Sequence, residues 1–373
     1  MMNKRNLKKL AELGVAMTVI ATLVVGCGGK SSTTETPATP ATPATPAVPA
    51  TRSITIDFGV LAQNGAASAV LGTDICAKAL TLGTNASGVA VAGQVNDMRF
   101  FVSGINLVDH NGVAHPVTLD ETAFQSTGVA LLDFESASAV ASGGTIADAA
   151  ANKCTGGTAA TNTVITGTVD NGPHYHGVDF VLGVPVKSTG ANPVELNHAN
   201  GATAGIAPLA AAGMSWNWQG GKKFTKIQYV PNTPMVVYNA SGVQATNASG
   251  VLATATTWNV HLGSTGCMFN PAASGVTPVT PAGYECGAPN RVPVALDGTL
   301  GGFLDSAGRS TQKVVVDLVE LFKTADLTKE AGGAAGCMSG AADPECVAIF
   351  SALQLSNGLP ASAVTTTPVF KLQ

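Results

Sequence analysis

The sequence predicts an all-β protein, an elongated antiparallel β-sandwich with loop insertions and a few short helices. Three observations lead to this prediction. Thr, Val and Gly are abundant, with 43 Gly in 373 residues, whereas the helix formers Lys, Glu and Leu are scarce. Only 11% of the residues are charged, against about 25% in an average soluble domain. Apolar runs of strand length recur, and clusters of Gly, Asn, Asp or Pro separate many of them.

The predicted strands follow one another at short spacing. Ser53–Phe58 alternates polar and apolar residues, as a strand with one buried face does. The further strand-like runs are Met98–Val108, Val117–Leu119, Val129–Phe134, Val164–Val169, Val178–Val184, Phe224–Val230, Trp258–Leu262, Val292–Leu296 and Val314–Phe322. Asp109-His110-Asn111-Gly112 predicts a hairpin turn, because Gly tolerates positive φ. The helix candidates are Ala207–Gly213, Ala325–Gly332 and Glu345–Leu353. An alternative to one sandwich is two stacked β-domains with a break near Pro185–Ala207.

The first 26 residues have the pattern of a targeting signal. Four basic residues lie between positions 4 and 9, and the apolar stretch Val15–Gly26 is too short to span a bilayer comfortably. The stretch leads into Cys27 through Val-Val-Gly, which resembles the lipobox of bacterial lipoproteins. Cys27 is therefore expected to carry acyl chains that anchor the protein in a membrane. Gly28, in place of an Asp retention signal, favours the outer membrane, facing the periplasm or the cell surface.

A low-complexity spacer follows the targeting signal. Ser31–Thr51 repeats Pro-Ala-Thr and cannot bury a core. The expected organisation is a signal peptide over 1–26, the lipidated Cys and linker over 27–52, and one folded domain over 53–373. The formal charge is −4, and the first 26 residues carry +3, which leaves −7 for the rest. This acidic balance argues against nucleic acid as a partner.

The cysteines indicate disulfides. Seven are present, and six remain if Cys27 is lipidated. An even number in an exported chain is typical of disulfide pairing, although six thiols allow about 15 pairings and the sequence does not choose among them. Pairing between neighbours would give Cys267–Cys286 and Cys337–Cys346, which leaves Cys76–Cys154.

The candidate functional residues concentrate between Leu196 and Arg291. This segment contains L-N-H-A-N from Leu196, M-S-W-N-W-Q-G-G-K-K-F from Met214, and W-N-V-H-L-G-S-T-G-C from Trp258. All three tryptophans and two of the six histidines lie in it. Because Trp, His and Cys bind or react with soft metals and oxidants, the segment points to metal or redox chemistry.

These motifs carry a resemblance to a known family. The run L-N-H, W-x-W-Q-x-G-x-K, H-L-G-S-T-G-C and C-x-x-P-N-R, with a late C-M-S-G…D-P-E-C, resembles the MbnP-like family, also called the metallo-mystery pair four-Cys motif proteins. The resemblance spans about Ile54 to Leu359. It implies an exported copper-binding protein that acts beside a di-haem cytochrome c peroxidase-like partner. It also implies that the partner oxidises a tryptophan to kynurenine, which helps to create the copper site.

The resemblance implies that His198 and His261 are metal ligands, since they occupy the two recurrent His positions of the family. Neutral imidazole suits copper in both oxidation states. His261 lies on a predicted strand whose neighbours Val260 and Leu262 face the other way, while Asn259 shares its face. The affinity for copper is expected to fall below about pH 6.5, where an ordinary imidazole becomes protonated.

A second pair of histidines has chelating spacing. His174 and His176 share a face if the chain is extended there, although the preceding Gly172-Pro173 is equally compatible with a loop. The family pattern does not require this pair, which remains a further candidate for metal binding. His110 and His115 flank the predicted hairpin turn and are expected to face solvent.

Three tryptophans are candidates for the oxidised residue: Trp216, Trp218 and Trp258. Trp216 and Trp218 share a face on an extended chain, where they could equally be an aromatic pair that caps the core. Ring opening would supply an aniline nitrogen and a ketone that indole lacks. Met214 and Met268 adjoin the motifs and could donate a thioether to copper(I), with core packing the alternative role for Met214.

The sequence therefore predicts an outer-membrane lipoprotein that binds copper and is not itself an enzyme. The alternative is a structural or adhesive surface lipoprotein without metal, and a third possibility is a copper-dependent oxidase. The motifs G-x-S-x-G, H-E-x-x-H and the Walker loop are all missing from the sequence, as is a C-x-x-C-H haem attachment site.

Overall fold

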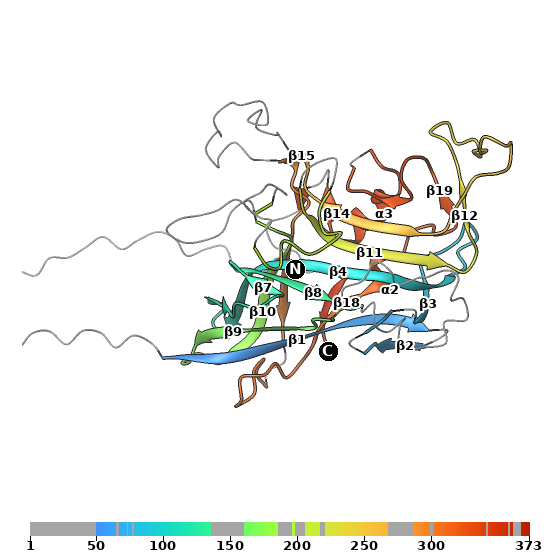
Figure 1. Cartoon of the computed structure of the whole chain (residues 1–373). Helices are drawn as coiled ribbons and strands as arrows, with labels where there is room; N and C mark the ends of the chain where they lie inside the picture. The colour runs from blue at the N-terminus through green and yellow to red at the C-terminus, as the bar shows by residue number, and fades with distance from the viewer. Residues whose placement is uncertain are drawn as a thin grey trace, which may run out of the picture. The chain divides into compact units, whose positions relative to one another are not determined.

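Two β-sheets packed face to face form the body of the protein in the computed structural model (Figure 1). The structure describes residues 50–64, 67–72, 74–76, 78–135, 160–185, 196–197, 206–216, 221–267, 286–298, 301–340, 342–356, 359–360 and 367–373. The first described strand begins at Thr51, at the end of the Pro-Ala-Thr spacer. The all-β sandwich expected from the composition is confirmed.

The smaller sheet is built around a long N-terminal strand. Its order is β23 (Phe370–Leu372), β18 (Val314–Asp317), β1 (Thr51–Asn64), β9 (Val164–Asp170) and β6 (Thr118–Leu119), with β2 (Ala67–Val70) also paired to β1. Alternation along β1 points Ile54, Ile56, Phe58 and Val60 into the core. β1 pairs with β18 in parallel. This sheet therefore combines a strand from the start of the folded domain with strands from near its end.

The larger sheet is organised by β4 (Val91–Asp109), a strand of 19 residues. One edge of β4 pairs first with β11 (Lys223–Pro231) and then with β10 (Tyr175–Leu182). Outward from these lie β14 (Trp258–Gly263), β20 (Gly336–Cys337) and β17 (Val292–Asp297). The other edge pairs with β3 (Ala79–Leu82), β8 (Val129–Asp133) and β5 (Ala114–Pro116), and β7 (Gln125–Ser126) pairs with β8.

Aromatic side chains from both sheets meet between them. Phe180 of the larger sheet packs edge-on against Phe58 and Phe370 of the smaller sheet, at ring-centroid separations of 6.0 and 5.3 Å. Phe100 of β4 also meets Phe370 edge-on, at 6.2 Å. A single apolar cluster joins residues from Ile54 to Phe370. This continuous core favours one sandwich over the alternative of two stacked domains.

Both faces of β4 are buried in its middle. Met98, Phe100 and Val102 face the core between the sheets, whereas Phe101 faces outward into a second, smaller apolar cluster. That outer cluster contains Phe101, Val129, Leu131, Val184, Leu196, Leu209, Met214 and Phe224. The segment 206–216 therefore covers the outer face of the larger sheet and shields the polar residues beside it from water.

The remaining elements are short. They are β12 (Met235–Val237), β13 (Thr254–Ala255) and β19 (Lys329–Glu330) in one sheet, the pairs β15 (Thr265–Cys267)–β16 (Cys286–Ala288) and β21 (Leu355–Ser356)–β22 (Leu359–Pro360), and the helices α2 (Leu318–Leu321) and α3 (Cys346–Ala352). Within the described part of the chain, no helix is long and apolar enough to cross a membrane.

Several local predictions are confirmed and three are wrong. The Asp109 turn joins β4 to β5 through a Gly112 N–H···O=C Asp109 bond of 2.9 Å, and α3 forms where a helix was predicted. The strand predicted over Val314–Phe322 ends at Asp317, whose carboxylate accepts from the backbone N–H groups of α2 and caps it. The candidate Ala207–Gly213 consists of turns that pack against the outer cluster, and Ala325–Gly332 is a turn and the short strand β19, which pairs with β12.

Candidate metal centre

A row of polar side chains crosses the outer face of the larger sheet. The strand registers place Asp133 of β8 opposite Arg99 of β4, Arg99 opposite Lys226 of β11, and Lys226 opposite His261 of β14. Directly opposed residues on neighbouring strands share a face. Four residues that are far apart in the sequence are therefore brought into one line under the 206–216 cover.

His261 ends this row as a half-buried imidazole. As predicted, Val260 and Leu262 point into the core on the other face. Burial, together with the positive charges of Lys223 and Lys226, lowers the pKa of His261 to about 3. Its Nε2 atom is buried and has no hydrogen-bond partner among the described residues. His261 is thus held neutral, with a ring nitrogen that can accept a bond.

Trp216 packs against this imidazole. The two rings meet edge-on with centroids 5.9 Å apart, and the ammonium of Lys223 lies 5.3 Å from the indole centroid. The indole reaches the sheet because Gly263 has no side chain, since a Cβ there would lie 2.6 Å from Trp216 Nε1. Trp216 is therefore the described tryptophan that borders the His261 ring.

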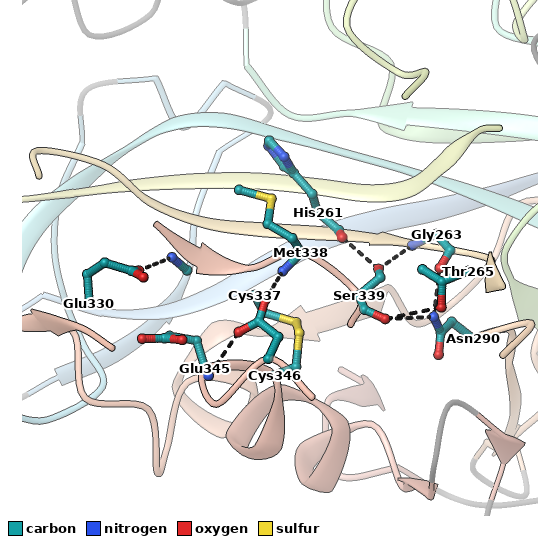
Figure 2. The surroundings of a disulfide bond; sticks show 12 residues. His261, Gly263, Thr265, Asn290, Glu330, Cys337, Met338, Ser339, Glu345 and Cys346 are labelled. Atoms are coloured by element: carbon teal, nitrogen blue, oxygen red, sulfur yellow. Dashed lines mark hydrogen bonds between the residues drawn. A yellow bond between two sulfur atoms is a disulfide. The ribbon is translucent and has the colours of Figure 1, made fainter. Parts of the chain in front are cut away.

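Met338 extends the row on the far side of His261. β20 runs parallel to β14 with Val260 opposite Cys337, which puts Met338 beside His261 on the outer face. Ser339 holds the two segments together, because its hydroxyl donates to His261 O at 2.7 Å and accepts from Gly263 N at 2.8 Å. Figure 2 shows the His261 ring and the Met338 side chain projecting to the same side, away from the Cys337–Cys346 disulfide. The two side chains carry an imidazole and a thioether on the same face of the sheet, and both groups can bind a metal ion.

The cations of the row are balanced by Asp97, two residues before Arg99 on the same face. Arg99 binds Asp97 in a two-pronged pair, with Nε···Oδ1 2.8 Å and Nη2···Oδ2 2.6 Å. The ammonium of Lys226 also contacts Asp97 Oδ2. Arg99 Nη1 donates to Ala212 O at 2.8 Å, which ties the cover segment to the sheet. The network positions Lys226 next to His261 and pairs its buried ammonium with a carboxylate.

Glu135 lies near this network without a partner of its own. Its side chain is fully buried, and neither carboxylate oxygen has a hydrogen-bond partner among the described residues. Burial raises its pKa to about 8, and the charges of Asp97 and Asp133 raise it as well, against the lowering effect of Arg99. Glu135 is therefore protonated at neutral pH.

We expect Glu135→Gln to stabilise the fold at alkaline pH. The pKa of Glu135 is about 8 in the folded protein and 4.5 in the unfolded chain. The contribution of protonated Glu135 to the free energy of unfolding is therefore fully present below pH 4.5, and it is lost as the pH rises to 8. Over that interval wild type should lose up to about 1.4 kcal/mol per pH unit relative to the variant. Thermal unfolding of both proteins at pH 5 and pH 9 measures the difference. An advantage of the variant that does not grow with pH would contradict this account.

The other candidate residues lie in different places. His198, Trp218, Met268 and Cys154 are outside the described residues. Trp258 lies in the core between the sheets, edge-on to Phe322 at 5.6 Å and on the face opposite His261. Met214 is buried in the outer cluster, in the packing role that was the alternative for it. Asn259 shares the face of His261, but its amide donates to Ala335 O at 2.8 Å.

The histidines of the hairpin region form a separate group near the start of β10. His174 and His110 are exposed, and His176 is half-buried. His115 does not face solvent freely as expected, since its ring lies between Asp109 and Asp170 at 3.5 and 3.3 Å. No group of three or more His, Cys, Asp and Glu side chains within the described ranges has the arrangement of a metal site.

Where both cysteines of a pair are described with their side chains, the structure contains the predicted disulfide Cys337–Cys346. Cys76 is also disulfide-bonded, and its expected partner Cys154 lies outside the described residues. Cys267 and Cys286 stand opposite each other in the β15–β16 ladder, so their predicted bridge joins adjacent strands. The pairing Cys76–Cys154 and the bridge Cys267–Cys286 stay predictions.

Met338 and the Asp97–Arg99–Lys226 network were not predicted from the sequence. A signal for the network was present, because Asp97 and Arg99 alternate with Met98 and Phe100 in an apolar strand. Charged residues two positions apart lie on the same face of such a strand, and they must form ion pairs when other residues cover that face. Met338 carried no comparable signal, since its position beside His261 depends on the β14–β20 pairing.

The fold and the site define a β-sandwich protein with a neutral, partly buried imidazole on the outer face of one sheet. The chain belongs to the MbnP family, whose model matches residues 51–339. It is similar to the solved structure of MbnP from Methylosinus trichosporium, with 32% identity and a TM-score of 0.65 over 87% of this chain and 98% of that chain. A comparison with curated proteins gave no match.

Proposed function

We propose that this protein is an exported lipoprotein that binds copper at a centre built around His261 and acts in copper acquisition or handling. The observation that carries the proposal is a neutral imidazole beside Trp216, whose buried Nε2 has no partner among the described residues. This imidazole lies in the H-L-G-S-T-G-C motif of an MbnP-family chain. A binding role, rather than an enzymatic one, is proposed.

The donors around His261 suit copper. Imidazole and thioether are ligands that copper(I) accepts readily, and both are neutral. The nearby charges of Lys223 and Lys226 disfavour a highly charged ion, so a monovalent ion with neutral donors fits this site best. We infer that His198 supplies a second imidazole. The residue before it, Asn197, accepts from Lys222 N at 2.8 Å, at the beginning of the strand that carries Lys226.

A tryptophan of the W-x-W motif would be oxidised to kynurenine by a di-haem cytochrome c peroxidase-like partner, which supplies the oxidising equivalents. Support for Trp216 comes from its contact with the His261 ring. Trp218 remains a candidate, as it belongs to the same motif. Trp258 is better explained as a core residue, because it is buried between the sheets on the opposite face.

The anchoring scheme follows from the N-terminal sequence. Lipidated Cys27 would hold the protein at the outer membrane, and the Pro-Ala-Thr spacer Ser31–Thr51 would separate the sandwich from the bilayer. This arrangement suits a protein that meets metal or a partner protein outside the cytoplasm.

Metal analysis of the protein purified from its native host tests the proposal. The expected result is stoichiometric copper, together with an intact mass that shows an oxidised tryptophan. Protein made without the di-haem partner should keep the unmodified mass. A host-purified protein that contains no copper and takes up none would instead support the structural or adhesive role.

A further inference from the structure

Two histidines outside the His261 centre lie side by side where β10 begins. His176 Nε2 and His174 Nδ1 are 3.0 Å apart, and the two rings meet edge-on with centroids 5.0 Å apart. The ring of His110, from the turn after β4, lies 6.2 Å from that of His176. The family pattern requires neither His174 nor His176.

The separation of the two ring nitrogens matches that of two ligands on one metal ion. An imidazole nitrogen binds a late transition-metal ion at about 2.0–2.1 Å. Two such nitrogens are then about 2.9 Å apart at a square-planar angle and about 3.4 Å apart at a tetrahedral angle. The observed 3.0 Å falls within this range. The same distance allows an imidazole–imidazole hydrogen bond in the metal-free protein, which metal binding would replace.

The backbone holds both rings in place. The register between β10 and β4 shifts between Tyr175 and Gly177, so His176 is the extra residue of a β-bulge. Bulges re-aim a side chain and are common beside binding sites. Tyr175 anchors the segment in the core, and the backbone oxygens of Tyr175 and His176 accept from Phe303 N and Gly298 N at 2.7 and 2.6 Å.

Gly302 orients the ring of His174. A Cβ at Gly302 would lie 2.8 Å from His174 Nε2, so the absence of a side chain lets the loop pass over that edge of the ring. The covered edge carries Nε2, and the opposite nitrogen, Nδ1, faces His176. This packing selects the nitrogen that pairs with His176 and reduces the ordering cost of chelation.

The surrounding charge favours a cation. Asp109 and Asp170 lie on either side of His115, whose ring packs edge-on against Tyr175 at 5.5 Å. One positive group, Arg52, lies 5.7 Å from the Tyr175 ring. The His261 centre is instead flanked by two lysines. The residue between the two histidines, Tyr175, therefore has carboxylates in its surroundings, whereas His261 has lysines.

We propose that His174 and His176 chelate a divalent late transition-metal ion, with Cu²⁺ bound most tightly, at a second site that is independent of the His261 centre. The preference for Cu²⁺ over Ni²⁺ and Zn²⁺ follows the usual order of affinity of nitrogen ligands. Solvent completes the coordination, and His110 is close enough to join it. The row of His261 crosses β4 at Arg99, and Tyr175 pairs with β4 at Asp109. About ten residues of β4 therefore separate the two sites, which corresponds to roughly 30 Å.

The test is a Cu²⁺ titration of the full exported protein whose His261 centre is already filled with copper(I), followed by electron paramagnetic resonance. Wild type should bind a further equivalent of Cu²⁺ with a signal typical of nitrogen ligands. His174→Ala and His176→Ala should each weaken this binding more than tenfold. The His261→Ala variant should retain it, because the two sites share no residue. Thermal unfolding checks that each variant is folded.

His115→Ala is the matched control, since it removes an imidazole from the same region without touching the chelating pair. It should leave the Cu²⁺ affinity within about threefold of wild type. Unchanged Cu²⁺ binding in the His174→Ala, His176→Ala double variant would overturn the proposal. So would an equal loss in His115→Ala, which would place the ion between Asp109 and Asp170. Neither result would bear on the proposed copper(I) site at His261, which is tested separately.

Discussion

Replacing His261 by alanine should weaken copper(I) binding more than about 100-fold in protein that is produced together with the di-haem partner. Loss of a ligand costs at least as much as loss of a group that only orients a ligand, which is about 10–100-fold. A competition titration with a copper(I) chelator measures the change. His115→Ala should bind copper(I) like wild type, because His115 lies with the other group of histidines. Wild-type affinity in His261→Ala would exclude His261 as a ligand.

The pH dependence of this site should differ from the expectation based on an ordinary imidazole. Metal binds the neutral ring, and the pKa of His261 is about 3 because burial and two lysines disfavour the imidazolium. Protons should therefore compete with copper at His261 only as the pH approaches 3, and the predicted fall below about pH 6.5 does not apply to this ligand. A fall in that range would come from another donor, such as His198. Repeating the titration with His198→Ala at pH 7 and pH 5 separates the two contributions.

Asp97→Ala should destabilise the fold by about 3–5 kcal/mol. The substitution leaves the buried charges of Arg99 and Lys226 without their shared carboxylate, and removing one partner of a buried ion pair has a cost of this size. Denaturant unfolding followed by circular dichroism measures the free energy of unfolding. The released Lys226 would also add positive charge beside His261, so copper(I) affinity should fall together with stability.

Lys323→Ala is the control for this prediction. Lys323 pairs with Glu320 at 3.2 Å on the surface, where its side chain is 66% exposed. An exposed pair contributes about 0–1 kcal/mol, so this variant should unfold almost like wild type. If the two substitutions lowered the free energy of unfolding equally, burial of the Asp97 network would not explain its contribution to stability.

The strands were predictable because their signal is local. A side-chain period of two residues shows in the sequence without knowledge of neighbours, and it placed Val260 and Leu262 opposite His261 before any pairing was known. The strand predicted through Phe322 failed at Asp317, where a capping carboxylate starts a helix in the middle of an apolar run. Apolar runs that change from strand to helix keep their hydrophobicity, so only the cap marks the change.

The sequence by itself determined the all-β class, the face on which His261 lies and the family of the chain, whereas the structure selected Cys337–Cys346 among the pairings that the sequence left open. Only the tertiary structure decided what stands beside His261. Strand registers that join distant parts of the chain place Lys226 and Met338 next to it, and Arg99 and Asp133 farther along the same row. The bulge at His176 and the close approach of Gly302 likewise depend on backbone pairing. Local propensity sets which residues form a strand and which way they face, whereas the order and register of strands are set by packing of the whole core.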